Sequence, residues 1–438
     1  MKSLVIKIIT YVISKQFLVV LRFFKLMHQN SVKNTSQDTA KISVINTFDK
    51  GGGAAKIAFD LSNSLKYIYE INFFVAFKKT NFDWIRQILP RKNNFIETII
   101  QTEAKSKGWI EFSGFNGLNL LKESFFNQSS IVHLHNLHGE FLSPFLYSIL
   151  FKNKKVIWTI HDESILTGHC GFTMKCEKWK IGCGNCPDLK IFPPVNYDNT
   201  LSVLKNKKKL ITKLQPVIVC PSFWLAESIR KVYPDLQHIE VIPNGINTSV
   251  FFPRDKEETR AELGLPKSKL LVLYVAEFAT NNPFKGGSIL REIIADKTFS
   301  EIVFITVGGN YDSGYSNHLC YNYIHDEVEL AKLYAACDVL LYPTQADNLP
   351  LVVLESMSSG TPVIASSVGG IPEIINTNKL GYLIEKYDEA AGFKQKLLEF
   401  IDMQVNEKLT LNLKVRNRVV EHFSFEQMIE SYKILYNK

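Results

Sequence analysis

Two carboxylates close to a predicted helix N-terminus are the side chains best placed to do chemistry. In residues 342–373, YPTQADNLPLVVLESMSSGTPVIASSVGGIPE, seven residues separate Asp347 from Glu355. Pro350 suits the first position of a helix, and Gly360 suits the position just past its end. A helix N-terminus attracts anions. A diphosphate could therefore lie against this helix while the two acids hold hydroxyl groups on either side.

The elements around this segment predict parallel sheets. Short apolar runs alternate with helical stretches from residue 41 onward, as in doubly wound α/β proteins. The expected strands are 42–45, 73–77, 131–135, 156–160, 217–220, 239–242, 270–275, 302–307, 339–342 and 363–365. The turn in residues 241–246, VIPNGI, reads as a hinge between two such domains.

Ligands bind at the carboxyl ends of strands in such sheets. His161 follows the expected strand 156–160 and is the best candidate of the first half. His133, His135 and His138 form a second group at another strand end and could line a pocket. Gly51-Gly52-Gly53 follows the first strand and opens the first helix, where glycines let backbone amides approach a ligand. A purely structural turn is the alternative for these glycines.

Together these motifs resemble a known family. The segment consists of an acid, seven further residues, a Glu, and then the run Gly-Thr-Pro-Val-Ile-Ala. This pattern is similar to the donor-binding signature of retaining nucleotide-sugar glycosyltransferases of family 4, which have the GT-B fold. Asp347 stands where the family usually has Glu. The hinge and the preceding residues 221–224, PSFW, also match the family. The resemblance as a whole covers roughly residues 41–437. An ordinary strand–loop–helix–strand of another α/β domain is the alternative.

The resemblance implies roles for individual residues. Glu355 would bind the ribose, and Lys285, in the Asn-Pro-Phe-Lys-Gly-Gly segment 282–287, would meet the donor diphosphate. Asp347 and His161 would position the sugar, and Gly51, Gly52, Gly53, Asn348 and Leu349 would approach the donor. The family implies a nucleotide-sugar as co-substrate and no catalytic metal. An Arg that the family often places a few residues before the Lys is missing here.

Four of the seven cysteines form a compact cluster, Cys170-x5-Cys176-x6-Cys183-Gly-Asn-Cys186. Cys-x2-Cys is a good half-site for tetrahedral thiolate coordination, and the other pair completes four ligands. We expect structural zinc in a knuckle spanning residues 161–190. Two disulfides or an iron–sulfur cluster are the alternatives. A similar arrangement occurs in a subset of family 4 enzymes of the exopolysaccharide and colanic-acid type. Cys220, Cys320 and Cys337 lie in apolar contexts typical of a core.

The net charge of +8 is concentrated at one end of the chain. Residues 1–40 hold six basic residues and one acid, so the remainder carries only +3. This distribution excludes a broad nucleic-acid surface. Apolar residues recur on one face of residues 1–30, but Lys7 and Lys15 interrupt every run long enough to span a bilayer. We expect a basic amphipathic helix on an anionic membrane. A helix packed on the enzyme itself and a tilted span are the alternatives.

The fold expected is α/β of the GT-B type: two doubly wound Rossmann-like parallel-sheet domains facing a cleft, plus the N-terminal amphipathic helix. The divisions are 1–40 for the extension, 41–245 for the acceptor-side domain and 246–438 for the nucleotide-sugar domain, whose final helix could pack back across the hinge.

The function expected is a retaining hexosyltransferase of bacterial surface polysaccharide synthesis. It would use a glycan or lipid-linked acceptor at the cytoplasmic face of the plasma membrane. A GT-B-fold sugar-nucleotide enzyme of another reaction type, such as an epimerase, and a zinc-knuckle nucleic-acid-binding protein are the alternatives.

Overall fold

The computed structural model describes residues 40–89, 95–277, 282–309, 314–377, 379–387 and 389–438. The expected amphipathic helix in residues 1–30 lies outside these ranges. Within them, no helix is both long and apolar enough to cross a membrane.

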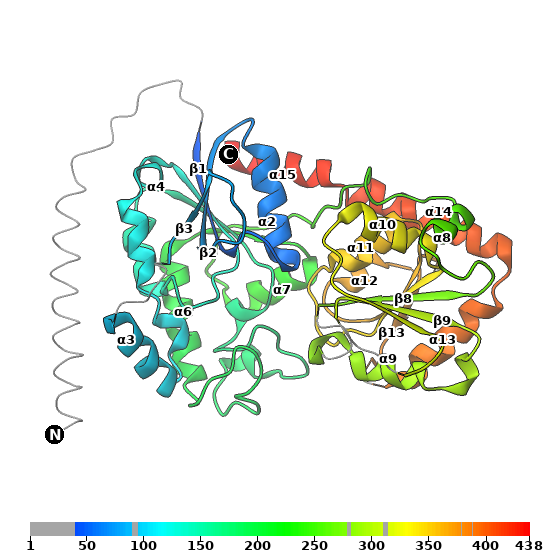
Figure 1. Ribbon diagram of the computed structural model, residues 1–438. Helices are drawn as coiled ribbons and strands as arrows, with labels where there is room; N and C mark the ends of the chain where they lie inside the picture. The colour runs from blue at the N-terminus through cyan, green and yellow to red at the C-terminus, as the bar shows by residue number, and fades with distance from the viewer. Residues whose placement is uncertain (1–39, 90–94, 278–281, 310–313, 378, 388) are drawn as a thin grey trace.

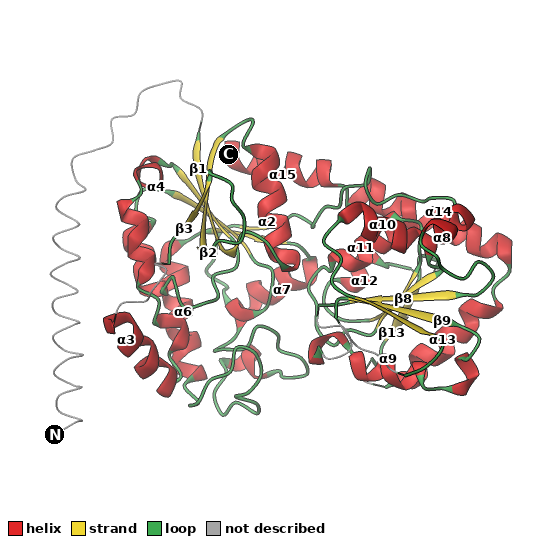
Figure 2. Cartoon of the chain, in the orientation of Figure 1, coloured by secondary structure: helices red, strands yellow, loops and turns green. Residues whose placement is uncertain are grey.

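The chain forms two lobes, each built on one parallel sheet (Figure 1, Figure 2). The first sheet has the order β3-β2-β1-β4-β5-β6-β7, with every neighbouring pair parallel. Its strands are β1 (Lys41–Phe48), β2 (Glu70–Phe77), β3 (Ile85–Gln87), β4 (Ile131–Leu134), β5 (Lys155–Thr159), β6 (Val217–Cys220) and β7 (Ile239–Val241). The central strands are buried, as their continuous apolar runs predict.

The α-helices of the first lobe lie around this sheet, with α3 set apart from its strands (Figure 2). They are α2 (Gly52–Leu65), α3 (Phe95–Ser106), α4 (Ser124–Gln128), α5 (Tyr147–Leu150), α6 (Thr200–Leu214) and α7 (Phe223–Val232). Helix α2 buries Ala55, Ala58, Leu61 and Leu65 at helical spacing, which explains why it lies flat on the sheet.

The second sheet has the order β10-β9-β8-β11-β12-β13 and is also parallel throughout. Its strands are β8 (Leu271–Val275), β9 (Val303–Val307), β10 (His318–Tyr321), β11 (Val339–Tyr342), β12 (Val363–Ser366) and β13 (Tyr382–Ile384). Its α-helices are α8 (Lys256–Glu262), α9 (Gly287–Ile294), α10 (Glu327–Ala336), α11 (Leu351–Ser358), α12 (Ile371–Ile374), α13 (Ala390–Asp402) and α14 (Val405–His422). The expected two-domain α/β fold is confirmed.

The last helix, α15 (Phe425–Asn437), leaves the second lobe and ends beside α2 of the first (Figure 1). A capping box at Ser424 starts this helix. Tyr432 and Tyr436 are buried and reach side chains of the first sheet: Tyr432 Oη lies 2.8 Å from Thr159 Oγ1, and Tyr436 Oη lies 2.7 Å from His133 Nδ1. Gly245, in the turn between the lobes, packs against the start of α15, where a Cβ would come within 2.7 Å of Phe425 Cα.

Candidate active site

Lys285 and Asp347 form an ion pair where two neighbouring strands end. Lys285 lies beyond β8 and Asp347 beyond β11, and these strands are adjacent in the second sheet. Tyr342 Oη donates to Asp347 Oδ2 at 2.6 Å and lies 3.2 Å from Lys285 Nζ. The structure therefore brings the expected diphosphate and sugar residues together, around a tyrosine that the sequence analysis missed.

Glu355 lies on α11, the helix that follows Asp347 in the chain. Only 6% of its surface is exposed. Tyr334 Oη donates to its Oε2 at 2.9 Å. Burial raises the pKa of Glu355 to about 7, against the opposing charge of Lys56. Lys56 comes from α2 of the first lobe and pairs with Glu327 at the start of α10. The site of Glu355 is thus bounded by both lobes.

The loop before α11 packs against a pair of glycines that follow β12, Gly369 and Gly370. Gly369 has φ of +56°, and a Cβ there would come within 1.8 Å of the Asp347 carbonyl oxygen. Gly370 N–H donates to the Asn348 carbonyl oxygen at 2.7 Å. Because neither glycine has a Cβ, residues 366–370 can pack directly against the backbone of Asp347 and Asn348. Pro350, expected as the first helical residue, is instead the N-cap of α11.

Asn348 and Leu349 contact the first lobe. Ser222 Oγ donates to Asn348 Oδ1 at 2.6 Å, and Asn348 Nδ2 donates to the carbonyl oxygen of Ile160 at 3.4 Å. Asn244 Nδ2 donates to the Leu349 carbonyl oxygen at 2.8 Å. Both residues are buried, and the loop is fixed against the first lobe by the side chain of Asn348 and the backbone carbonyl of Leu349.

The contact through Ile160 brings His161 and Asp347 to the same interface, since each is the neighbour of a contacting residue. The glycines at residues 51–53 form the start of α2, as expected. Gly51 and Gly52 have φ of +108° and +71°, values that favour glycine. A Cβ on Gly53 would lie 3.7 Å from Leu351 Cδ1, so this loop faces the first residue of α11 across the lobes.

His161 meets another histidine at the carboxyl edge of the first sheet. Its Nε2 lies 2.9 Å from His135 Nδ1, and the two ring planes are 15° apart. Burial lowers the pKa of His161 to about 4 and lowers the pKa of His135 well below its ordinary value. Both rings are therefore neutral at physiological pH.

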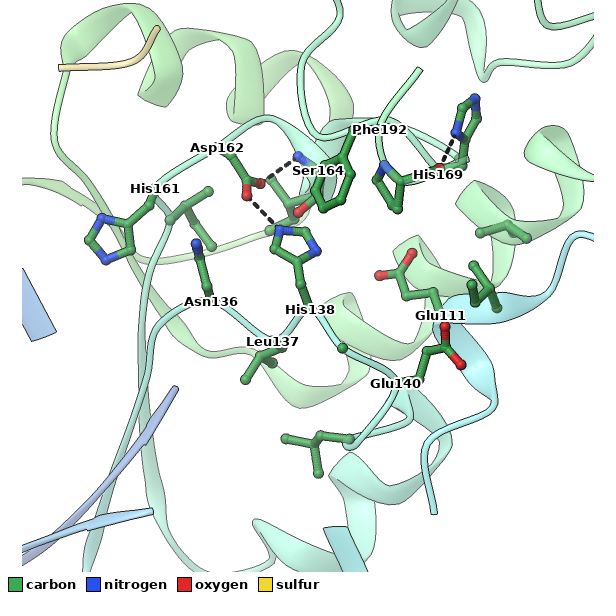
Figure 3. Close-up of a pocket in the computed structure, with 18 of the residues that line it drawn as sticks. Glu111, Asn136, Leu137, His138, Glu140, His161, Asp162, Ser164, His169 and Phe192 are labelled. Atoms are coloured by element: carbon green, nitrogen blue, oxygen red, sulfur yellow. Dashed lines mark hydrogen bonds and ion pairs between the residues drawn. The ribbon is translucent and has the colours of Figure 1, made fainter. Parts of the chain in front are cut away.

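A cavity of about 320 Å³ lies beside this histidine pair in the first lobe, and Figure 3 shows part of its lining. His138 and Asp162 face each other there, with His138 Nε2 2.6 Å from Asp162 Oδ2, while the ring of His161 points away from that of His138 (Figure 3). Burial alone would raise the pKa of Asp162. The charge and hydrogen bond of His138, with the N–H of Ser164, lower it to about 2.

Burial would likewise lower the pKa of His138, but Asp162 raises it. No motif in the sequence predicts this ion pair. Of the second histidine group, His135 and His138 line the cavity. His133 does not, because its Nδ1 and Nε2 lie within hydrogen-bond distance of Tyr436 and Thr159.

The four clustered cysteines line one small pocket with His169. Its volume is about 20 Å³, and its lining includes Cys170, Cys176, Cys183 and Cys186. All four are free thiols, and burial raises the pKa of Cys170 to about 12. Among the described residues, no three His, Cys, Asp or Glu side chains are gathered as a metal site. Cys220 and Cys337 are buried as expected, whereas the expectation for Cys320 is wrong: it is exposed on the edge strand β10.

Residues 255–419, which include β8–β13 and the Lys285–Asp347 pair, match the family model described as glycosyl transferases group 1. The chain is 27% identical to the colanic acid biosynthesis glycosyl transferase WcaC of Escherichia coli (strain K12). The match spans 325 residues, 70% of this chain and 76% of the relative.

The chain is also 28% identical to the UDP-Gal:alpha-D-GlcNAc-diphosphoundecaprenol alpha-1,3-galactosyltransferase of Escherichia coli. This match covers 48% of this chain and 59% of the relative. The sucrose-phosphate synthase of Thermosynechococcus elongatus shares the fold, with a TM-score of 0.69 at 18% identity, over 91% of this chain and 98% of that one. These similarities identify a glycosyltransferase in which residues 255–419 match the group 1 family and the two parallel-sheet domains have the GT-B fold.

Proposed function

We propose that this protein transfers a hexosyl group from a nucleotide-diphosphate sugar to a glycan or lipid-linked acceptor, with retention of configuration, in the synthesis of a bacterial surface polysaccharide. The observation that carries the proposal is the Lys285–Asp347 pair at the carboxyl edge of the second sheet, across the interface from His161. A fixed cation and a hydroxyl-binding acid side by side suit the diphosphate and sugar of one donor.

Each residue has a role in the proposed donor site. Lys285 binds the diphosphate, Glu355 accepts hydrogen bonds from the ribose, and Asp347 and His161 hold the sugar. The glycines at 51–53 let the start of α2 come close to the donor. Asn348 holds the loop in place through Ser222, and Leu349 places its backbone beside the donor.

The reaction exchanges one bond for another on the same face of the sugar. The bond between the anomeric carbon and the diphosphate oxygen breaks as the bond to the acceptor oxygen forms, through an oxocarbenium-like state. The acceptor proton passes to the departing phosphate oxygen. Lys285 stabilises the negative charge that develops there, and the closed interface limits access of water.

The cavity beside His138 and Asp162 suits the acceptor, because it lies in the lobe opposite Lys285, Asp347 and Glu355 and reaches His161. The name of the galactosyltransferase relative includes a diphosphoundecaprenol, which supports a lipid-linked acceptor here. The basic, apolar residues 1–30 would hold the enzyme at the anionic cytoplasmic face of the plasma membrane. If so, deleting residues 1–30 abolishes co-sedimentation with anionic vesicles; unchanged binding contradicts this part of the proposal.

We also propose that the cysteine cluster binds one structural zinc ion. The four thiols share one pocket, and zinc binding would draw them together and release their protons. Elemental analysis of the purified protein should give one zinc per chain, reduced by Cys183→Ser and retained by the control Cys320→Ser. Equal zinc in both variants, or none in the wild type, contradicts this assignment.

The first test of the donor site is calorimetric titration of UDP, GDP and ADP into the wild type and Glu355→Ala. One nucleotide should bind to the wild type, and the variant should bind it more weakly by about 1–3 kcal/mol, the scale of a lost charged hydrogen bond. Absence of binding by all three to folded protein contradicts the donor site. Turnover of the donor without an acceptor would instead favour an epimerase-like enzyme.

A further inference from the structure

Two imidazoles share one hydrogen bond where adjacent strands of the first sheet end. His135 directly follows β4, His161 comes two residues after β5, and these strands pair in parallel with Leu134 opposite Trp158. The bond joins His135 Nδ1 to His161 Nε2 over 2.9 Å. Trp158 Nε1 also donates to the His135 carbonyl oxygen at 3.0 Å, which fixes the backbone of His135.

Only one of these two nitrogens can carry the shared proton. Because both rings are neutral, two arrangements exist. In the first, His135 Nδ1–H donates and His161 carries its own proton on Nδ1. In the second, His161 Nε2–H donates, His135 carries a proton on Nε2, and His161 Nδ1 is a bare acceptor.

The surroundings of His135 distinguish the two arrangements. Its Nε2 is buried and has no hydrogen-bond partner among the residues that the structure describes. The ring centroid of His133 lies 4.2 Å from that of His135, but both nitrogens of His133 lie within hydrogen-bond distance of other groups, Tyr436 Oη and Thr159 Oγ1. The second arrangement would bury an N–H with no acceptor, which proteins avoid more strictly than a bare acceptor. The first arrangement is therefore the stable one.

We propose that His135 is a positioning residue that fixes His161 in the tautomer with a proton on Nδ1, and thereby presents an N–H donor to an oxygen of the sugar. His161 Nδ1 makes no hydrogen bond to the residues that the structure describes, so it is available for this contact. This inference rests on the proposed function for its activity readout. It assigns His161 the role of a hydrogen-bond donor, not that of a base acting through Nδ1.

The tautomer can be read directly by long-range proton–nitrogen NMR of ¹⁵N-histidine-labelled full-length protein, with the His161 signals assigned by their loss in His161→Asn. Wild-type His161 should show a protonated Nδ1 and a bare Nε2. In His135→Asn, the amide Nδ2 lies near the former Nδ1 and can donate the same bond, so this pattern should persist. In His135→Leu, which has no donor, it should change to a mixture or to the other tautomer.

Activity provides a second readout. His135→Leu should lower kcat about tenfold with a smaller change in KM, and His135→Asn should recover most of the loss. His422→Asn, on the surface of α14, is the matched control and should leave both readings unchanged. A bare Nδ1 on wild-type His161, or an unchanged tautomer in His135→Leu, overturns the inference. Absence of sugar transfer with the expected tautomer present would instead contradict the proposed function alone.

Discussion

Removing the negative charge of Glu355 should stabilise the nucleotide-free protein while weakening donor binding. The carboxylate is 6% exposed, and burial raises its pKa from 4.5 to about 7. Ionising the carboxyl in the folded protein therefore costs free energy. This loss of stability grows as the pH rises from about 4.5 to 7 and reaches its full size above pH 7. The difference of 2.5 pKa units corresponds to about 3 kcal/mol at 1.36 kcal/mol per unit.

Glu355→Gln keeps the shape of the side chain and an oxygen that can accept from Tyr334. We expect the variant to exceed the wild type in free energy of unfolding by up to about 3 kcal/mol at pH 8, and by much less at pH 5. Urea denaturation at both pH values, without nucleotide, measures this difference. Glu301→Gln is the control, because its side chain is 90% exposed.

The same variant should bind the donor nucleotide more weakly, because an amide is a poorer acceptor for ribose hydroxyls than a carboxylate. Two results would refute the reasoning. One is a Glu355→Gln protein that is less stable than the wild type by the same amount at pH 5 and pH 8. The other is a gain in stability that is also present in Glu301→Gln, which would remove burial as its cause.

Three further predictions concern other contacts. Lys285→Met should weaken nucleotide-diphosphate binding by about 1.5–3 kcal/mol, with partial recovery in Lys285→Arg, as measured by calorimetry; equal affinities in all three proteins would contradict the assigned role. Asp162→Asn should lower the free energy of unfolding by roughly 2 kcal/mol at pH 7. The pKa of Asp162 is lowered from 3.8 to about 2, so its stabilising contribution is full above pH 4 and lost as pH falls to about 2. A loss of equal size at pH 7 and pH 2 in acid denaturation would point to packing instead. The carboxylate of Glu373 accepts from the backbone N–H groups of Phe223 and Trp224 at 2.8 and 2.7 Å, which links the lobes at the start of α7. Glu373→Ala should therefore increase the radius of gyration in small-angle scattering, and an unchanged radius would show that other contacts hold the lobes together.

The buried strands were predictable because continuous apolar runs leave few alternatives. The missed strands are β3, β10 and β13, and each lies at the edge of its sheet. An edge strand needs only one paired side and carries a weaker apolar pattern, as the half-exposed residues of β10 illustrate. Their contribution comes from tertiary pairing, which the local sequence does not encode strongly.

Motifs in the sequence single out the individual candidate site residues, but not most of the contacts between them. Lys285 and Asp347 were each identified by motif, yet their contact follows from β8 and β11 being neighbours, which requires the strand order. His135 and His161 were placed in separate groups for the same reason. Apart from one short 3-10 helix, Lys178–Ile181, the cysteine segment is irregular, so the relative positions of its thiols could not be worked out from the sequence.

The path of α15 has a consequence for how the protein is made. Tyr432 and Tyr436 complete contacts with β4 and β5, yet they are synthesised long after those strands. Roughly 180 residues separate Gly245 from Phe425, and at about 5–20 residues per second their synthesis takes on the order of 10–40 s. During that time the first lobe has its strands but lacks its final helix. The surface that α15 covers is therefore exposed on the nascent chain for that time, and loss of α15 would damage the lobe that was made first.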